Sequence, residues 1–392
     1  MFGWEFPPYN SGGLGVACQG LAYALAQGGT DLTFVLPKKM SVGSDAFDII
    51  FADTSSLPLA NPYSSPLQYS NSVPFYGASL FDEVERYGLA ARAIARQRDF
   101  DIIHAHDWLS LKAGLQAKAV SGKPLVFHVH ATEFDRTGGT HINSQVYEIE
   151  REGMQRADAV VAVSDFTKSI ITRNYGIAPE KVHVVHNGIN AQSYETMKPD
   201  NLLALKRLGK KIVLFVGRIT LQKGPDYFLR AAKGVLAYAP DTLFIIAGSG
   251  DMEAQIIQQA ASLGIAQNIM FAGFLRGQEL VALYRVADVM LMPSGSEPFG
   301  IASLESLANG TPVILSKQSG ASEVLAHVLK VDFWDVDEMV NKIVCLLRNP
   351  ALQATLQKNG REDVKKLTWR KAARKCMEVY RELMGNMVST NA

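Results

Sequence analysis

The sequence lacks the features that would send a protein into or across a membrane. None of its apolar runs approaches the ~18 residues that a membrane-spanning helix needs, and it does not begin with the basic and apolar stretches of a secretory signal. The net charge of the 392 residues is only +1, which gives no strong field for attracting nucleic acid or a membrane surface. We therefore expect a cytoplasmic protein with no integral membrane segment and no nucleic-acid partner.

Cysteine is scarce, and no common nucleotide-binding fingerprint is present. The three cysteines, Cys18, Cys345 and Cys376, follow no disulfide or metal-site spacing, as expected in a reducing compartment. The glycine-rich stretch YNSGGLGVACQGLAYAL fails the dinucleotide pattern G-x-G-x-x-G because Cys18 stands where the third glycine belongs. It is not a P-loop either, because no Gly-Lys-Ser/Thr follows. Gly12 and Gly13 would still let the backbone at a helix start approach a phosphate or a sugar.

Short apolar runs typical of buried strands alternate with helical patterns along the whole chain. In the second half these runs are found at residues 211–218, 242–248, 268–273, 288–294 and 311–316. In the first half they are found at residues 32–37, 100–106, 124–131, 159–164 and 181–188. Such alternation predicts parallel sheets that are covered by helices on both faces. Residues 54–80, rich in Ser, Pro, Tyr and Asn, are expected to form a long loop.

The two series of strands predict two doubly wound α/β domains that face each other. The boundary is expected in the loop-like stretch HNGINAQSY, so that residues 1–187 form one domain and residues 188–369 the other. Ligands of such sheets bind outside the carboxyl ends of the strands. We therefore expect the ligands in a crevice between the domains.

Two carboxylates stand close together in the stretch SGSEPFGIASLE, which follows a predicted strand. Glu297 is expected on the loop, and Glu305 about one turn inside the helix that begins near Ile301. Backbone amides from Phe299 to Ile301 would then point out of a helix N-terminus, where anions bind readily. Carboxylates are acceptors that bind diols well, so the pair could bind two parts of one elongated ligand. The alternative is that Glu297 only caps the helix and Glu305 is a surface acid.

Two cations stand in the stretch GRITLQKG, at the end of another predicted strand. Arg218 supplies a planar fork of donors, and Lys223, five residues on, supplies a point charge. This combination suits a diphosphate. The alternative is that both residues are ordinary surface charges near a turn.

Two His-x-His pairs end the predicted strands that contain HAHD and HVHA. Residues two apart on a strand share a face, so His104 with His106, and His128 with His130, could bind a metal. The alternative is that one histidine of each pair packs inside while the other serves the crevice. A metal-dependent hydrolase that uses His104, His106, Asp107 and His130 is therefore a second hypothesis from a different enzyme class.

Taken together, these motifs resemble those of the nucleotide-sugar glycosyltransferases of family 4. The family's E-x(7)-E signature is matched by Glu297 and Glu305 within EPFGIASLE, and GRITLQKG, VVHNGIN and AVSDFTKSII match further parts of the family pattern in the same order. The resemblance covers nearly the whole chain. It implies the GT-B fold, with two Rossmann-like domains, an interdomain crevice and a C-terminal helix, here about residues 370–392, that returns to the first domain.

The resemblance also implies roles for individual residues on the donor side. Arg218 and Lys223 would hold the donor diphosphate, Glu305 would bind the donor ribose, and Glu297 would face the donor sugar. The remaining donor contacts would come from Gly12, Gly13, Phe274, Leu275, Phe299, Gly300 and Ile301. His130 matches the family's histidine near the reacting carbon, so that the implied catalytic group is Glu297, His130, Arg218 and Lys223.

The acceptor side is implied by a second set of motifs. HAHDW and SGGLG resemble the glycogen and starch synthase branch, which extends α-1,4-glucans from ADP- or UDP-glucose. His106, Asp107 and Glu133 would lie on this side, and transfer would retain the anomeric configuration without a metal or another cofactor. One departure from the branch is Asn10, which stands where those enzymes have a lysine.

Several alternatives stay open on the same residues. The acceptor could be another small sugar or a cell-surface glycan. A nucleotide-sugar epimerase, a phosphorylase or a non-catalytic glycan-binding protein would share the fold.

Overall fold

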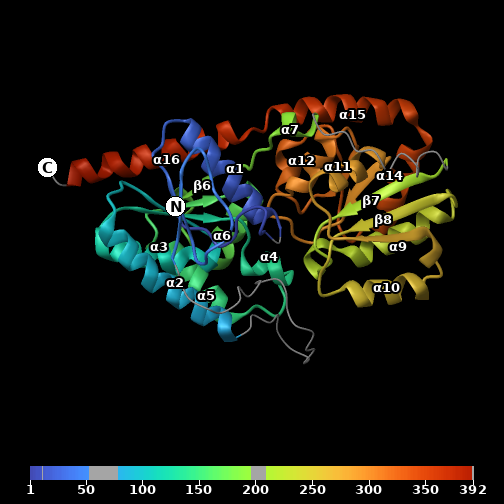
Figure 1. The fold of residues 1–392 in the computed structure, drawn as a ribbon. Coiled ribbons are helices and arrows are strands. Elements are labelled where there is room, and N and C mark those ends of the chain that lie inside the picture. The colour runs from blue at the N-terminus through green and yellow to red at the C-terminus, as the bar shows by residue number, and fades with distance from the viewer. Residues whose placement is uncertain (11, 53–77, 196–208, 391–392) are drawn as a thin grey trace. The chain divides into compact units, whose positions relative to one another are not determined.

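The computed structural model describes residues 1–10, 12–52, 78–195 and 209–390 (Figure 1). The chain divides into two α/β units. The first unit combines Met1–Gly188 with Trp369–Ala392, and the second is Ile189–Thr368. Most of the long loop expected at residues 54–80 lies outside the described residues, and a helix begins at Ala78. Among the described residues, no helix is both long and apolar enough to cross a bilayer.

The first unit contains two groups of parallel strands, and the first residues of the chain lie between them and pair with both. Its strands are β1 (Thr33–Leu36), β2 (Asp48–Phe51), β3 (Ile103–His106), β4 (Leu125–Val129), β5 (Ala159–Ala162) and β6 (Val182–Val184). β1 pairs with β2, and the others pair in the order β3-β4-β5-β6. Phe2 bridges Val35 of β1 and Ala105 of β3, both in parallel. The first residues therefore act as a short central strand.

Helices cover both faces of this sheet. They are α1 (Gly13–Gln27), α2 (Ala78–Gln97), α3 (Asp107–Ser121), α4 (Glu133–Thr137), α5 (Ser144–Arg156), α6 (Asp165–Tyr175) and α16 (Trp369–Thr390), with a 3₁₀ turn at Pro179–Lys181. One apolar core includes Tyr87 of α2, Leu111 of α3 and Met154 of α5. The other core includes Leu21 of α1 and Tyr380 of α16. Burial on both faces explains why the strands are continuous apolar runs.

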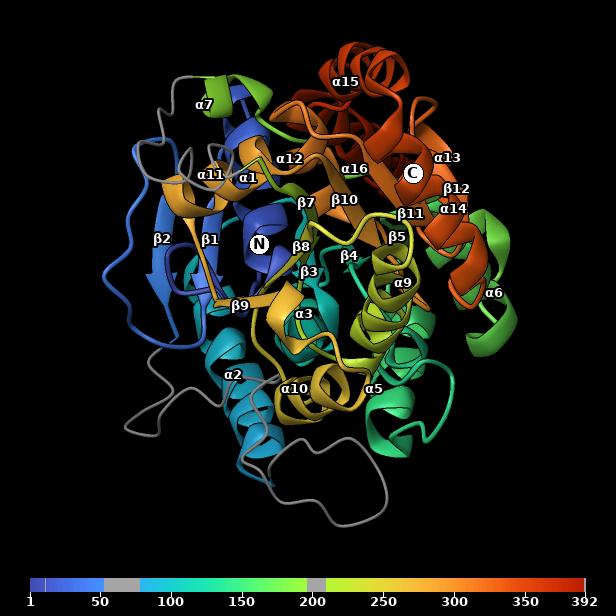
Figure 2. The same ribbon diagram turned by 90° about the vertical axis from the view of Figure 1, so that its right-hand side faces the viewer.

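The second unit contains a sheet of parallel strands in the doubly wound order. Its strands are β7 (Lys211–Val216), β8 (Thr242–Ala247), β9 (Ile269–Gly273), β10 (Val289–Met292), β11 (Val313–Ser316) and β12 (Leu329–Val331). They pair in the order β12-β11-β10-β7-β8-β9 (Figure 2). The order reverses between β7 and β10, which pair directly. Ligands of such sheets bind at the carboxyl ends of the strands at this reversal.

The helices of the second unit cover its sheet in the same two-layer manner. They are α7 (Ala191–Glu195), α9 (Pro225–Leu236), α10 (Glu253–Ser262), α11 (Gly277–Val286), α12 (Ile301–Ala308), α13 (Ala321–Val324), α14 (Val336–Arg348) and α15 (Pro350–Lys365), with 3₁₀ turns at Leu221–Lys223 and Ala266–Asn268. Phe228 of α9 and Leu346 of α14 are fully buried in one core. α9 begins with Pro225, a residue that suits the first turn of a helix because its missing N–H has no partner there anyway.

Helix α16 is distant in sequence from the rest of the first unit but packs closely on α1. Figure 1 shows it in red on the unit that contains α1. A Cβ added at Gly20 of α1 would overlap the indole ring of Trp369, the first residue of α16. Cys376 and Tyr380 continue the contact in the buried core. The absence of a side chain at Gly20 therefore sets how closely the two helices approach.

We expect the substitution Gly20→Ala to lower the free energy of unfolding by ~1–3 kcal/mol, the usual cost of overpacking a core. Thermal or urea unfolding of the whole chain measures this change. Gly88→Ala is the matched control, because an added Cβ in α2 would meet no atom closer than 3.4 Å. It should be neutral or stabilising by up to ~1 kcal/mol, the helix propensity that alanine gains over glycine. Equal stability of the two variants would contradict the tight contact.

Candidate functional site

The reversal point of the second sheet brings together the cations and one carboxylate that the sequence motifs predicted. Arg218 follows β7, and Lys223 ends the 3₁₀ turn that comes next. Glu297 lies on the loop after β10. Nζ of Lys223 lies 2.6 Å from Oε2 of Glu297, and both side chains are mostly buried. The burial of Lys223 and its direct pairing with Glu297 argue against the alternative in which this lysine is an ordinary surface charge.

Two close backbone contacts fix the loop after β7 against the loop after β10. Gly224 has φ +68°, and a Cβ at this position would overlap the carbonyl oxygen of Pro293. The backbone N–H of Gly295 donates to the carbonyl of Gln222 over 3.0 Å. The positions of Lys223 and Glu297 are therefore set by backbone contacts and not by the ion pair alone.

The loop after β10 is also bound to the segment that precedes α13. The N–H of Glu297 donates to the carbonyl of Gln318 at 2.8 Å, and the N–H of Ala321 donates to the carbonyl of Phe299 at 2.7 Å. Gly300 then adopts φ +100°, where a Cβ would come within 2.9 Å of the Met292 side chain. This turn starts α12, whose first amides have no partner within the helix and carry its partial positive charge.

Glu305 lies on α12 and accepts hydrogen bonds from two tyrosines that the sequence motifs did not indicate. The hydroxyl of Tyr284 donates to Oε2 at 2.9 Å, and that of Tyr194 donates to Oε1 at 3.2 Å. Burial raises the pKa of the Glu305 carboxyl, and the two hydroxyls offset part of this effect. Each carboxylate oxygen has a second lone pair, so Glu305 can still accept hydrogen bonds from a ligand.

The other predicted donor residues of this unit lie around the same strand ends. Nη2 of Arg218 donates to Oε1 of the buried Gln222 over 3.3 Å. Phe274, directly after β9, is 47% exposed, and the guanidinium of Arg276 lies 4.6 Å from the centre of its ring. Leu275 is half-buried. The sequence motifs did not indicate Gln222 or Arg276.

In the first unit, the glycine-rich turn has an open backbone. α1 begins at Gly13, and no atom lies within 4 Å of the place where a Cβ of Gly12 would be. The side-chain amide of Asn10 donates to the carbonyl of Gly12 over 2.9 Å. The N–H of Gly15 donates to the buried carboxylate of Glu5 over 3.1 Å. Asn10, the departure from the glycogen synthase branch, therefore helps to shape this turn.

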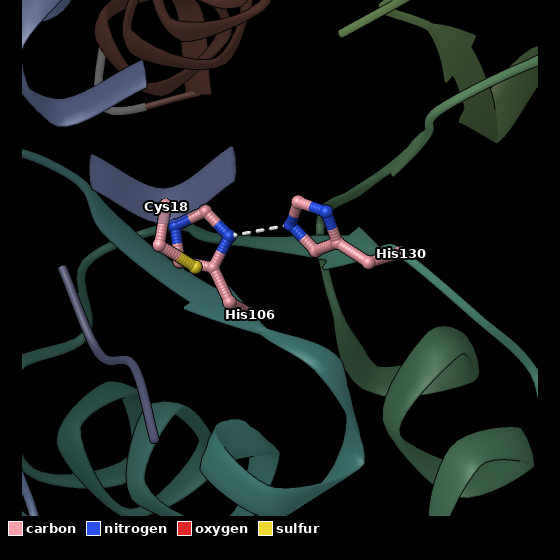
Figure 3. A group of neighbouring side chains, drawn as sticks. All are labelled: Cys18, His106 and His130. Atoms are coloured by element: carbon pink, nitrogen blue, oxygen red, sulfur yellow. Dashed lines mark hydrogen bonds between the residues drawn. The ribbon is translucent and has the colours of Figure 1, made fainter. Parts of the chain in front are cut away.

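The four histidines of the two His-x-His pairs form one cluster. Stacked rings lie 4.5 Å apart for His104 and His106, and 4.3 Å apart for His128 and His130. Nδ1 of His106 lies 2.9 Å from Nε2 of His130 (Figure 3), and Nε2 of His104 lies 3.1 Å from Nδ1 of His128. Burial lowers the pKa of all four, that of His130 to about 3, so the rings are uncharged at neutral pH.

This arrangement settles how the histidine pairs lie. The members of each pair share a face of the sheet, as the strand geometry predicted. The rings of each pair are stacked. The alternative in which one histidine of each pair packs inside agrees with the second pair, where His128 is buried and His130 partly exposed. It does not agree with the first pair, where His104 and His106 are both buried. His130 is partly exposed, whereas the other three are buried. The described residues include two groups of possible metal ligands in this region, one of them His104, His106 and His128.

Asp107 and Arg136 hold the backbone at His130 from two sides. Oδ1 of Asp107 accepts from the N–H of His130 at 2.6 Å and from the N–H of Ala131 at 3.3 Å. Nη1 of Arg136 donates to the carbonyl of Ala131 over 2.9 Å. Asp107 has φ +56°, a conformation that is uncommon for residues other than glycine. Burial raises the pKa of its carboxyl to about 7, although Arg136 opposes the shift.

Glu133 also lies in this buried network. Its Oε2 accepts from Nε of Arg136 at 3.1 Å, and its Oε1 accepts from the N–H of Asn143 at 3.1 Å. Arg136 also contacts Glu150, which accepts a hydrogen bond from the hydroxyl of Tyr175. Glu133 therefore shapes the loop that carries His130. A direct contact between Glu133 and an acceptor stays a prediction, as it does for His106 and Asp107.

Comparison with known proteins is consistent with this geometry. Residues 11–193 match the family Glycosyltransferase Family 4, and residues 204–363 match Glycosyl transferases group 1. An uncharacterized glycosyltransferase of Methanocaldococcus jannaschii is 29% identical, over 98% of this chain and 99% of its own length. A glycogen synthase of Mycobacterium tuberculosis is 29% identical over 83% and 80%. A D-inositol 3-phosphate glycosyltransferase of Salinispora arenicola is 31% identical over 75% and 71%.

Solved structures show the same fold at lower sequence identity. A sucrose-phosphate synthase from Thermosynechococcus elongatus superposes with a TM-score of 0.80 at 22% identity, covering 98% of both chains. The Anabaena protein HepE, solved in complex with UDP-glucose, superposes with a TM-score of 0.71 at 18% identity, covering 97% of this chain and 98% of its own.

The family matches together span most of the chain, and they agree with the doubly wound sheets and with the residues gathered at their strand ends. The chain belongs to glycosyltransferase family 4 and is a nucleotide-sugar glycosyltransferase with the GT-B fold.

Proposed function

We propose that this chain transfers glucose from ADP-glucose or UDP-glucose to an α-1,4-glucan, with retention of the anomeric configuration. The observation that carries the proposal is the buried pair of Lys223 and Glu297 at the reversal point of the second sheet, next to the N-terminus of α12. The relative named glycogen synthase supports the glucan acceptor, and the HepE complex with UDP-glucose supports the donor. Family membership favours glycosyl transfer over metal-dependent hydrolysis by the histidines.

The charges of the second unit suit the donor. Arg218 and Lys223 bind the diphosphate, and the amides of Gly300 and Ile301 add the positive end of α12. Glu305 accepts hydrogen bonds from the ribose hydroxyls, and Glu297 accepts them from the sugar. The backbone at Phe299 completes the sugar contact, and Phe274 and Leu275 lie against the base. In the first unit, the open turn at Gly12 and Gly13 lets the backbone approach the phosphates and the sugar.

The mechanism follows from where charge develops. Cleavage of the bond between sugar and phosphate leaves positive charge on the anomeric carbon and negative charge on the leaving diphosphate. Arg218 and Lys223 stabilise the negative charge without a metal. The acceptor hydroxyl attacks from the face that the diphosphate leaves, and the leaving phosphate takes the proton of that hydroxyl. His130, uncharged and held through its backbone by Asp107, orients the sugar and does not act as a base.

A smaller acceptor is the second candidate. The relative named D-inositol 3-phosphate glycosyltransferase is 31% identical over 75% of this chain, against 29% over 83% for the glycogen synthase. Asn10 stands where the glucan-synthase branch has a lysine. Its side chain is uncharged and donates a hydrogen bond to the carbonyl of Gly12, so the turn lacks the positive charge that the branch has there. A cell-surface glycan is a further alternative acceptor.

The experiment that tests the proposal is thermal unfolding in metal-free buffer with a panel of ADP-, UDP- and GDP-sugars. A ligand at 100 times its dissociation constant adds about 2.7 kcal/mol to the stability. We expect a shift with ADP-glucose or UDP-glucose, followed by incorporation of glucose into glycogen or maltooligosaccharides. A shift confined to a GDP-sugar or an N-acetylated sugar would overturn the glucose donor, and incorporation into inositol phosphate alone would overturn the glucan acceptor.

Lys223→Ala tests the diphosphate contact. We expect donor binding and turnover to fall together, with turnover lower by roughly 10²–10³, the cost of losing one preorganised charge partner. Lys317→Ala is the matched control, because Lys317 pairs with Asp332 over 2.8 Å at an exposed place in the same unit. Steady-state kinetics with the donor varied measures both variants. Turnover of Lys223→Ala equal to that of the control would remove Lys223 from the site.

Glu305→Gln tests the cost of a buried carboxylate that binds ribose. The raised pKa means that ionisation of Glu305 favours the unfolded chain at pH values above the ordinary glutamate range. We therefore expect the stability of the variant to increase relative to wild type as the pH rises from about 4 to about 7. Urea unfolding over this range measures it, and a difference that does not change with pH would contradict the desolvation.

The same variant separates ribose binding from chemistry. Ribose contacts exist in the ground state and the transition state alike, so KM for the donor should rise by at least about tenfold while kcat stays nearly constant. A change confined to the affinity for the acceptor would contradict the ribose role.

A further inference from the structure

One cysteine lies against the histidine cluster of the first unit. Cys18 comes from α1, His106 from the end of β3, and His130 from the residues just after β4. One ligand atom of each, the thiol sulfur and a ring nitrogen of either histidine, lies within 4.8 Å of the other two. Figure 3 shows the Cys18 sulfur beside the ring of His106, with His130 facing that ring from the other side. Three elements far apart in sequence thus converge on one point.

The cluster also contains a buried polar atom without a partner. Nε2 of His106 has no hydrogen-bond partner among the described residues, and this side chain is fully buried. Such atoms are rare in native structures, and each needs an explanation, for example a bound water or ion. The other ring nitrogen, Nδ1, lies 2.9 Å from Nε2 of His130, so a metal shared by Cys18 and the two histidines would bind Nδ1 and replace this hydrogen bond, while Nε2 could accept or donate to a water.

We propose that Cys18, His106 and His130 form a binding site for Zn²⁺ that is separate from the donor residues of the second unit. Two imidazole nitrogens and one thiolate are ligands that zinc prefers, and three protein ligands leave a fourth tetrahedral position for water. Zinc binds the thiolate form of cysteine, so binding displaces the proton of the Cys18 thiol, which passes to solvent.

The neighbouring group of His104, His106 and His128 is a less suitable site. All three of these histidines are buried, whereas His130 is partly exposed and gives an entering ion access from solvent. The thiol of Cys18 also adds the softer ligand, which favours zinc over magnesium or calcium.

Zinc at this site would stop the reaction rather than support it. This consequence rests on the proposed function, in which His130 orients the sugar as a free imidazole. A metal bound to His130 blocks that contact. We therefore expect added Zn²⁺ to inhibit turnover and a chelator to restore it.

The binding test needs no turnover. Co²⁺ added to the whole chain in place of Zn²⁺ should give a thiolate-to-cobalt charge-transfer band, and Zn²⁺ should displace it at about one ion per chain. In Cys18→Ser the band should vanish, and Zn²⁺ affinity should fall by at least ~100-fold, because even outer-shell partners cost 10–100-fold. Absence of the band in wild type, or an unchanged band in Cys18→Ser, would overturn the site.

Two further variants guard against misfolding and against binding elsewhere. His130→Gln changes the partly exposed ligand and should also lose Zn²⁺ affinity while its circular dichroism stays native. Cys345→Ser removes an exposed free cysteine of the second unit and should keep the band. Loss of the band in Cys345→Ser alone would assign the metal to that cysteine and overturn the proposal.

These experiments distinguish failure of the metal site from failure of the proposed function. Wild-type chain that binds Co²⁺ through Cys18 but no nucleotide sugar would keep the metal site and reject the glycosyl donor. Where turnover is present, Cys18→Ser should remain active at Zn²⁺ concentrations that inhibit wild type. Equal inhibition of both forms would show that zinc inhibits from another place and would overturn the inhibitory role.

Discussion

The direct pairing of β7 with β10 is the constraint on which the candidate donor site depends. Because β8 and β9 lie to one side of β7, and β11 and β12 lie beyond β10, the loops leaving β7 and β10 run to opposite faces of the sheet. Side chains from both loops can then reach the space above the two strand ends. Lys223 and Glu297 meet there although 74 residues separate them. In a strand order that separated β7 from β10, the two motifs would lie apart.

The ends of β7 and β10 also gather buried charged groups, whose removal from water lowers the stability of the folded chain. An ion pair removed from water gains little net stability, because desolvation offsets most of the Coulomb attraction. The pair of Lys223 and Glu297, and the carboxylate of Glu305 with its raised pKa, therefore contribute less to stability than apolar residues could. The proposed binding of the diphosphate and the ribose explains why a chain would keep such groups at the ends of these strands.

Much of the fold could be predicted from the sequence, because buried parallel strands are short apolar runs that periodicity detects. β7 to β11 lie within the predicted ranges. β2 and β12 were missed because each is short and neither is fully buried: β2 is half-exposed along its length, and β12 has three residues, one of them exposed. Motifs indicated Glu305 but not Tyr194, because a hydrogen bond across 111 residues leaves no local pattern.

The histidine cluster of the first unit also depends on contacts between residues far apart in the sequence, which local patterns do not predict. Strand geometry predicted that His104 and His106 share a face, but the contact of His106 with His130 depends on the register of β3 against β4. Burial keeps these rings uncharged, whereas the second unit supplies fixed cations. In the proposed mechanism, an uncharged imidazole orients the sugar without repelling the positive charge of the anomeric carbon, while the fixed cations stabilise the departing diphosphate. The proposed function therefore assigns uncharged histidines of the first unit and fixed cations of the second unit to different parts of the reaction.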